Sequence, residues 1–325
     1  MQVIPAIDLL DGACVRLHKG DYDQATMYND HPLSQAKAFA DAGFTHIHVV
    51  DLNGAKQGEF VNLLHIQEMI HQLGLSVQTG GGIRRFEDAK SLLDAGLSKV
   101  ICSSMAIQNE ADWLRLVQEY PQQSILGLDL KEGQMAFGGW LETASEPPES
   151  MVARMQQQGL QEVLCTDISK DGTLSGTNLD LYVQLKSSFP DLRWIASGGV
   201  SGASDLEALD HAGIDAVVVG KAYYEGHLSL EEMAKINLNP GVNEKAAGKY
   251  ALKSLESAIH DLKEQNIDAL VTAPINKNNI QSDKFKFPGH TEYLESHSEG
   301  KALMLMLSDE LRVGVVTGHL PLQKV

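Results

Sequence analysis

Two aspartates have the residue type and the placement that proton transfer needs. Asp8 ends the apolar run that begins at Val3, and Asp129 ends the similar run that begins at Ile125. Two carboxylates that face one substrate can remove one proton and donate another, provided that their surroundings set different pKa values. Either residue alone could instead cap the helix that follows it. The matching positions of the two residues favour paired acid–base catalysis.

Small residues follow four other apolar runs and predict binding sites for anions. Glycine turns at 80–82 and 198–199 form one matched pair, and residues 103–104 and 220–221 form a second. Small residues let backbone N–H groups approach an anion closely, and a helix that starts there adds a favourable dipole. The glycines could instead serve tight turns alone. Two matched pairs favour two phosphate sites, and hence a long substrate with a phosphate at each end.

The elements that must position these residues alternate along residues 1–237. Short apolar or β-branched runs predict strands, and amphipathic stretches between them predict helices. Eight strand–helix units in about 235 residues match a (β/α)8 TIM barrel, whose active site lies at the carboxyl ends of the strands. The expected strands are residues 3–7, 46–50, 77–79, 100–102, 125–128, 162–165, 194–196 and 216–219, and expected helices include residues 32–42, 86–95, 111–119, 148–158, 179–187 and 204–212.

An internal repeat divides this region into two half-barrels. Residues 4–8 resemble 125–129, 48–51 resemble 163–167, 78–83 resemble 196–200, and 100–104 resemble 217–221. The four matches keep their order at offsets of 116 to 121 residues. Self-similarity at a nearly fixed period is typical of repeated architectures. The repeat predicts that Asp8 and Asp129 lie on opposite sides of one barrel mouth.

Two loop residues and three histidines each have two interpretations. Trp140, in a glycine-flanked loop, could stack on an aromatic base or serve as a buried anchor. Asp171 lies in the loop after the sixth strand and could enter the site when that loop closes, or it could be a turn residue before a glycine. His46, His48 and His65 lack the spacing of metal ligands, so a structural role is predicted for them.

Composition excludes several classes of partner. The net charge of −17 argues against binding to a nucleic-acid backbone. No apolar run approaches the roughly 18 residues that a membrane helix needs, and the start of the chain lacks the basic segment of a signal peptide. The three cysteines, Cys14, Cys102 and Cys165, form no CxxC motif. A cytoplasmic protein without a membrane or nucleic-acid partner is therefore expected.

The charge of the chain changes near residue 238. Residues 1–237 hold 16 Lys+Arg and 32 Asp+Glu, whereas residues 238–325 hold 10 and 11. The net charge is thus −16 before the break and −1 after it. The break coincides with the turn-forming tetrapeptide at 238–241, so two domains, 1–237 and 238–325, are predicted.

Residues 1–237 closely resemble the phosphoribosylformimino-aminoimidazole carboxamide ribotide isomerase family of histidine biosynthesis. The resemblance rests on the segments 5–9, 11–12, 15–17, 19–21, 48–55, 80–84, 138–140 and 166–173. The related cyclase of the same pathway differs at the first strand, which here reads Pro-Ala-Ile-Asp-Leu. The family implies an Amadori rearrangement of an aminoaldose to an aminoketose, on a substrate with two phosphates and with no cofactor or metal.

The same resemblance implies a role for each site residue. Asp8 is the expected base and Asp129 the expected acid, with Thr166 beside it, while Asp171 is a competing candidate for the acid. Trp140 and Arg84 would hold the imidazole carboxamide end of the substrate. The residues expected to hold the phosphates are Arg16, Gly20, Gly81, Gly82, Ser103, Gly199 and Gly220.

Residues 241–325 resemble a central slice of the 4-hydroxythreonine-4-phosphate dehydrogenase family of vitamin B6 synthesis, on the segments 267–277, 287–294 and 312–322. The resemblance implies substrate contacts at His290 and Thr291 and one metal ligand at His319. The other two metal histidines and the nicotinamide-binding part of that family have no counterpart, and one histidine does not make a divalent metal site. A truncated fragment without dehydrogenase activity is therefore expected.

The fragment still has the pattern of a small fold. Residues 249–264 predict an amphipathic helix, and residues 269–273 and 312–317 predict buried strands. Parallel strands taken from a larger sheet leave open edges, which invite pairing. A dimerisation or solubility module is therefore the alternative function for this segment, and self-association through it is the partner that it predicts.

Overall fold

The computed structural model describes residues 1–18, 20–236, 245–298, 304–307 and 312–315. The chain divides into two compact units, Met1–Asn237 and Leu238–Val325.

The first unit is a closed barrel of eight parallel strands, as the sequence predicts. The strands follow one another around the barrel in the order β10, β11, β12, β1, β4, β5, β6 and β7, and pairing of β7 with β10 closes the ring. The bounds are β1 Gln2–Leu10, β4 His46–Asp51, β5 Ser76–Gly80, β6 Lys99–Cys102, β7 Ser124–Lys131, β10 Glu162–Asp167, β11 Arg193–Ser197 and β12 Ala216–Val219.

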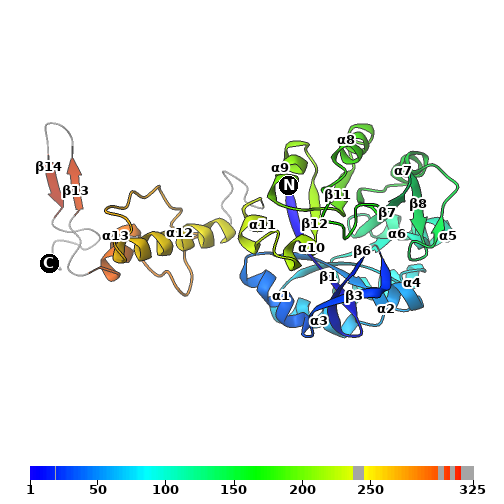
Figure 1. Ribbon diagram of the computed structural model, residues 1–325, viewed down its shortest axis with the longest axis horizontal. Helices are drawn as coiled ribbons and strands as arrows, with labels where there is room; N and C mark the ends of the chain where they lie inside the picture. Colours follow the sequence, from blue (N-terminus) through cyan, green and yellow to red (C-terminus); the bar gives the residue numbers. More distant parts are fainter. Residues whose placement is uncertain (19, 237–244, 299–303, 308–311, 316–325) are drawn as a thin grey trace. The chain divides into compact units, whose positions relative to one another are not determined.

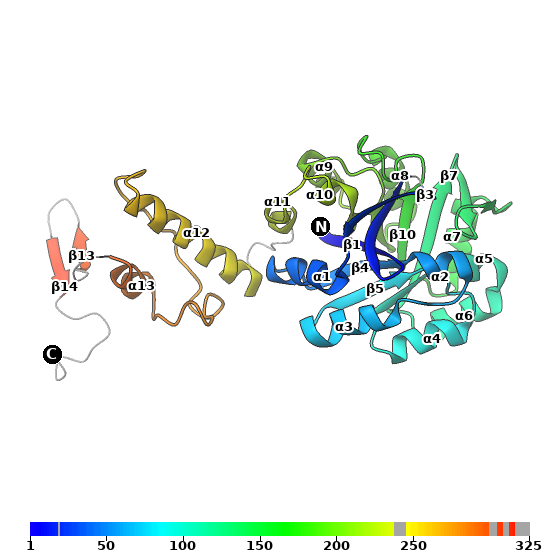
Figure 2. The ribbon, with the colours of Figure 1, turned by 60° about the horizontal axis from the view of Figure 1, so that its bottom comes forward.

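Helices surround this ring of strands, as Figures 1 and 2 show for the first unit. Their buried residues repeat at helical spacing, for example Phe86, Ala89 and Leu93 on one helix. This helix thereby turns an apolar stripe toward the strands. The helices are α1 Pro32–Asp41, α2 Leu52–Gln57, α3 Leu63–Leu73, α4 Phe86–Asp94, α5 Ser104–Gln108, α6 Glu110–Glu119, α7 Pro148–Gln157, α8 Leu179–Ser188, α9 Ala203–His211, α10 Lys221–Tyr224 and α11 Leu230–Ile236. No described helix has the length and hydrophobicity needed to cross a membrane.

Each half-barrel also carries an antiparallel extension that the sequence patterns do not predict. After β1, the strands β2 (Ala13–His18) and β3 (Asp21–Asn29) fold back along it. After β7, the strands β8 (Gln134–Phe137) and β9 (Glu142–Thr143) do the same. The first strand of each half thus ends in a hairpin, and these two hairpins bring Arg16 and Trp140 to the site described below.

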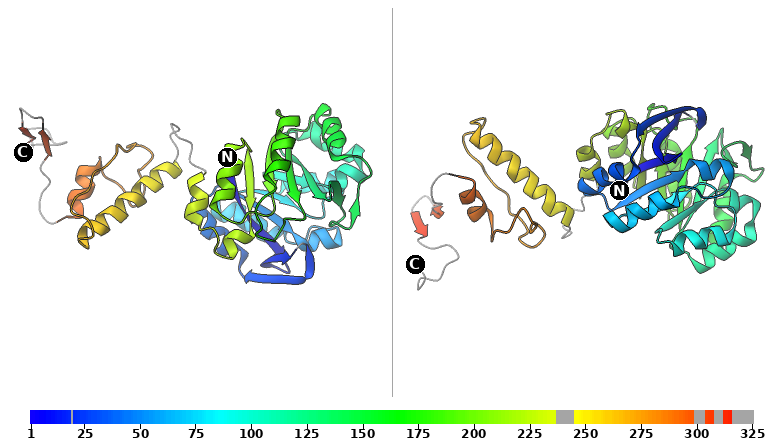
Figure 3. Two further views of the ribbon diagram at one scale, coloured as in Figure 1. Left: turned by 45° about the horizontal axis from the view of Figure 1, so that its top comes forward. Right: turned by 90° about the horizontal axis from the view of Figure 1, so that it is seen from below.

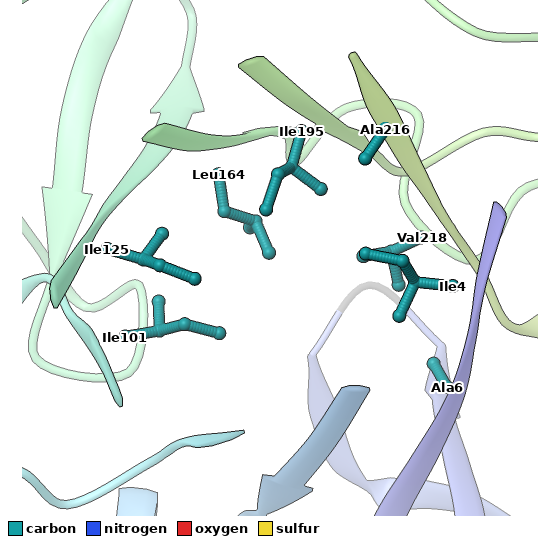
Figure 4. Close-up of a cluster of buried hydrophobic side chains, with 8 residues drawn as sticks. All are labelled: Ile4, Ala6, Ile101, Ile125, Leu164, Ile195, Ala216 and Val218. Atoms are coloured by element: carbon teal, nitrogen blue, oxygen red, sulfur yellow. The ribbon is translucent and has the colours of Figure 1, made fainter. Parts of the chain in front are cut away.

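Apolar side chains fill the middle of the barrel. Ile4, Ile101, Ile125, Leu164 and Ile195 belong to one buried cluster, which Ala6, Ala216 and Val218 complete. Figure 4 shows these side chains pointing toward one another inside the ring of strands. The cluster takes members from six of the eight barrel strands, whereas β4 and β5, both described in full, add none.

A carboxylate anchors the loop that follows the second strand of each half. Asp51 accepts hydrogen bonds from the backbone N–H groups of Gly54 and Asn62 and from Nδ2 of Asn62 at 2.7–2.9 Å. Asp167 accepts bonds from Ser169 and, at 2.7 Å, from Nδ2 of Asn178. In each half the aspartate and the asparagine are eleven positions apart. The repeat therefore extends from the strands to the hydrogen bonds that shape their loops.

The second unit contains a small core along one helix. Helix α12 (Lys245–Lys263) presents Leu252, Leu255 and Ile259 on one face, and Phe285 and Tyr293 pack against them. Figure 3 shows α13 (His290–Ser296) beside α12 in both views. The predicted helix 249–264 is confirmed in substance, although it begins four residues earlier.

The strand predictions for this unit are only partly right. Residues 269–273 form no strand, and the side chain of Val271 is 94% exposed. A segment of high strand propensity needs a neighbour to pair with, and no such neighbour accompanies it in the described residues. Strand β14 (Arg312–Val315) does form, within the predicted range 312–317, of which 316–317 lie outside the described residues. It pairs antiparallel with β13 (Met304–Leu307) rather than in a parallel sheet.

Candidate active site

One cavity at the carboxyl ends of the barrel strands holds every barrel residue to which the sequence gives a catalytic or binding role. It is lined by Asp8, Arg16, Gly20, Gly81, Gly82, Arg84, Ser103, Asp129, Trp140, Thr166, Asp171, Gly199 and Gly220. Asp8 on β1 and Asp129 on β7 are four strands apart in either direction around the ring. The glycines after β5 and β11 also lie opposite each other. The cavity thus has a carboxylate and a glycine turn on each side.

Asp8 is held by Arg16 from the hairpin next to it. Nη1 of Arg16 donates to Oδ2 of Asp8 at 2.8 Å, and Nη2 donates to the carbonyl oxygen of Ala6 at 2.9 Å. The guanidinium also lies 5.3 Å from the ring centre of Tyr224, whose hydroxyl donates to the same carbonyl. Burial raises the pKa of Asp8, and the charge of Arg16 opposes that rise. Arg16 therefore fixes the orientation of this carboxylate in addition to lying beside the turn at Gly220.

The other two carboxylates differ in their surroundings. Burial raises the pKa of Asp171 to about 6, and the negative charges of Asp8 and Asp129 contribute to the rise. Burial also raises the pKa of Asp129, but hydrogen bonds with Trp140, Thr166 and Ser103 work against it. Hydrogen bonds of this kind stabilise the carboxylate anion. Asp171 is therefore a carboxyl group that holds its proton up to a pH of about 6, while side-chain hydrogen bonds favour the anion of Asp129.

The glycine turns on the two sides are built alike. Gly82 has φ of +79°, and a Cβ there would lie 2.6 Å from the carbonyl oxygen of Gly54. Gly199 has φ of +84°, and a Cβ there would lie 2.5 Å from the carbonyl oxygen of Gly176. Both the left-handed backbone and the close approach require glycine. Each turn is thus pressed against the loop that precedes it in the same half-barrel.

Two alanine substitutions can separate the effect of the close contact between Gly82 and Gly54 from the effect of a positive φ angle. We expect Gly82→Ala to lower stability by about 1–3 kcal/mol and to raise KM about tenfold, because the turn must shift away from Gly54. Gly213 has φ of +75°, but a Cβ there would meet no other atom within 4 Å. Gly213→Ala is therefore the control and should lose some stability at unchanged KM. Equal effects of the two variants on KM, measured with thermal unfolding and steady-state kinetics, would contradict this expectation.

Trp140 and Arg84 both line the cavity. Trp140 has φ of +68°, an unusual backbone angle for a bulky residue. Its ring packs on Gly20, where a Cβ would lie 2.8 Å from Cε3 of the indole. Arg84 is exposed, and its guanidinium packs on Gly58. The two hairpins of the barrel thus meet through Trp140 at one edge of the site.

Lys221 and His48 also line the cavity, although the family resemblance names neither as a site residue. Lys221, directly after Gly220, donates from Nζ to the carbonyl oxygen of Gly172 at 2.7 Å and so ties the loop of Asp171 to the end of β12. Its position after a strand-ending glycine is the signal in the sequence that points to it. His48, for which a structural role is predicted, also lines the cavity. Burial, with the charge of Arg16, lowers its pKa to about 3.

The second unit contains two of the site residues that the sequence predicts there among its described residues. His290 and Thr291 form the first turn of α13 and are partly buried. His319 lies outside the described residues. The described residues contain no group of three or more His, Cys, Asp or Glu side chains arranged to hold a metal ion.

Comparison with known proteins identifies the barrel. Residues 2–229 match the family described as histidine biosynthesis protein. The chain belongs to the histidine biosynthesis protein family. Members of this family from Cytophaga hutchinsonii and Listeria welshimeri are 41% and 42% identical to the chain, over 73% of it and over 99% and 98% of their own lengths. A third, from Synechocystis sp., is 41% identical over 71% of the chain and 91% of its own length.

The names of these three relatives describe isomerases of an imidazole-4-carboxamide that carries a 5-phosphoribosyl group and a (5-phosphoribosylamino)methylideneamino group. The barrel thus has the isomerase function of histidine biosynthesis that the sequence predicts. Residues 200–325 match a second family, the pyridoxal phosphate biosynthetic protein PdxA. The chain therefore joins a histidine biosynthesis barrel to a PdxA-like segment, as the two resemblances in the sequence predict.

Proposed function

We propose that the barrel is an aldose–ketose isomerase that converts a bisphosphorylated aminoaldose into the corresponding aminoketose. The observation that carries this proposal is the pair of carboxylates on opposite strands, Asp8 and Asp129, between two glycine turns that are also opposite each other. A substrate with a phosphate at each end can place one phosphate in each turn. Its sugar then lies between the carboxylates.

The first step opens the sugar ring. A carboxylic acid, Asp171 or Asp129, donates its proton to the ring oxygen while the bond between C1′ and that oxygen breaks. The lone pair of the exocyclic nitrogen forms the second bond to C1′, which gives a protonated Schiff base. The acid is left as a carboxylate, and the positive charge rests on the nitrogen.

The second step moves the proton that defines the isomerisation. Asp8 removes the proton from C2′, and the electrons of that C–H bond form the double bond between C1′ and C2′. The electrons of the C=N bond return to nitrogen, which becomes neutral. The resulting enolamine loses its hydroxyl proton and gains a proton at C1′, which gives the ketone. Arg16 holds the carboxylate of Asp8 in place by a hydrogen bond. Its positive charge also favours the anionic form of Asp8, which is the form that accepts the proton.

Turnover of the aminoaldose by the full chain and by a chain that ends at Asn237 tests the proposal. We expect equal kcat/KM, because the Cytophaga hutchinsonii relative matches over 99% of its own length with 238 residues. The substrate is followed by its ultraviolet spectrum together with chromatography of the product. Absence of turnover in both chains would refute the proposed reaction, and activity in the full chain alone would make the second unit a required part of the enzyme.

The second unit has a separate candidate function as a dimerisation module. The segment 269–273, which forms no strand, carries the exposed side chain of Val271 and offers a backbone that another chain can pair with. We expect light scattering after size-exclusion chromatography to give a larger number of protomers for the full chain than for the chain that ends at Asn237. Equal numbers would contradict a role in self-association. We propose no dehydrogenase activity for this unit.

A further inference from the structure

The two halves of the barrel differ at one interior level where their repeat predicts similarity. In the first half His48 on β4 and Gln78 on β5 are direct partners across neighbouring strands. At the matching place in the second half, Leu164 on β10 and Ile195 on β11 are direct partners. Leu164 and Ile195 belong to the apolar cluster of Figure 4. A hydrogen-bonded polar pair therefore occupies the place that an apolar pair fills on the opposite side.

Packing alone does not account for this polar pair. Both side chains are buried, with 8% of His48 and 7% of Gln78 exposed. Buried polar groups lose their hydration and stabilise a fold only when they are paired, whereas an apolar pair of suitable shape can replace them at little cost. The second half shows that Leu and Ile suit this level of the same architecture. The polar pair must therefore serve the site that His48 lines.

The hydrogen bond within the pair sets the tautomer of the imidazole. Nε2 of Gln78 lies 3.2 Å from Nδ1 of His48. An amide nitrogen can only donate, so Nδ1 accepts and the neutral ring carries its proton on Nε2. The neighbouring charge of Arg16 disfavours a second proton on the ring. His48 is thereby fixed as a neutral donor at the wall of the cavity, with Gln78 behind it as its positioning residue.

Two similar phosphate turns do not by themselves determine in which direction a substrate with two phosphates binds. A substrate with a phosphate at each end can bind in either of two directions, but only one of them places its aminoaldose at Asp8. The glycine turns after β5 and β11 repeat their contacts across the barrel, so this pair of turns distinguishes the two directions poorly. The His48–Gln78 pair breaks this symmetry beside β1, because β4 is the strand paired with β1 and His48 is the partner of Ala6.

We propose that His48 donates a hydrogen bond from Nε2 to the substrate and that the His48–Gln78 pair thereby fixes the direction in which the substrate lies. This inference rests on the proposed isomerisation of a bisphosphorylated substrate. The donor contributes in the productive direction, whereas in the reversed direction it meets a different part of the substrate.

The double variant His48→Leu/Gln78→Ile tests the proposal, because it gives the first half the pair that the second half already contains. We expect its melting temperature to stay within a few degrees of the unaltered enzyme and its kcat/KM to fall about ten- to hundredfold. We also expect the 31P spectrum of its complex with the bisphosphorylated product to show two sets of bound phosphate resonances, one for each direction. The unaltered enzyme should show one set. His48→Gln, whose amide nitrogen can replace Nε2 as a donor, should retain more activity than the double variant.

Unchanged kcat/KM in the double variant, or a single set of phosphate resonances, would overturn the proposal. The 15N spectrum of the unaltered enzyme tests the tautomer even if the double variant does not fold: a proton on Nε2 supports the proposal, and a proton on Nδ1 overturns it. An unaltered enzyme without turnover would instead refute the proposed reaction itself, so the two failures can be told apart.

Discussion

Asp8→Asn is expected to lower kcat about 10²- to 10⁴-fold, the usual contribution of a positioned general base. Asparagine keeps an oxygen that can accept the bond from Arg16, but it cannot take the proton from C2′. The isomerisation therefore stops at the Schiff base. Exchange of the C2′ proton with deuterium from the solvent measures this step directly, and we expect it to be lost together with turnover.

Binding separates a missing base from a damaged site. The phosphate turns of Asp8→Asn are unaltered, so its affinity for the bisphosphorylated product should change by only a few-fold. Asp30→Asn, at a carboxylate whose side chain is 74% exposed, is the control and should behave like the unaltered enzyme. Proton exchange at C2′ that persists in Asp8→Asn would show that another group is the base.

Asp171→Asn is expected to lower kcat/KM by a similar factor, about 10²- to 10⁴-fold, and to change its dependence on pH. A general acid must hold its proton in the free enzyme, and the pKa of Asp171 is raised to about 6. In the unaltered enzyme kcat/KM should therefore fall as the pH rises through about 6. Asp171→Asn should lack this decline at its lower rate, whereas Asp129→Asn should keep it. The reverse pattern in the two variants would identify Asp129 as the acid.

The same carboxyl group predicts a change in stability with a definite sign. A folded-state pKa that is raised above the unfolded value means that burial favours the protonated form. This contribution to stability is present below the unfolded pKa and is lost as the pH rises through about 6. Asp171→Asn removes that loss and should raise the free energy of unfolding at pH 8 by about 2–3 kcal/mol, but not at pH 4. Equal melting temperatures of the two proteins at pH 8 would argue against a buried charge at this position.

The sequence predicts the barrel because its strands are buried on both faces and therefore read as apolar runs. It does not predict the hairpin of β3, since that strand is largely exposed and its residues follow no apolar pattern. The prediction for residues 269–273 fails for the opposite reason. That segment has the composition of a buried strand, but a strand also depends on a partner, which local sequence does not specify.

The candidate site follows a similar division. Asp8, Asp129 and the glycine turns could be predicted because the repeat marks them twice. The environments of Asp129 and Asp171 depend on burial and on side chains from other loops, which the spacing of residues does not encode. His48 lacks metal-ligand spacing and therefore belongs to no motif of its own. The repeat itself contained the signal, because it sets His48 against an apolar residue in the other half.

The Asp51–Asn62 and Asp167–Asn178 bonds have a consequence for how new specificities arise in this barrel. Each bond joins the two ends of one loop, and both residues of the bond belong to a single half of the barrel. Lengthening a closed loop costs little, about 0.6 kcal/mol for each doubling. The segment between the two residues of either pair can therefore be extended while the pair keeps its ends in place, provided that Gly54, Asp171 and Gly176, which these segments contain, are retained. One end of the binding site can then evolve toward a new substrate while the other end continues to recognise the old one.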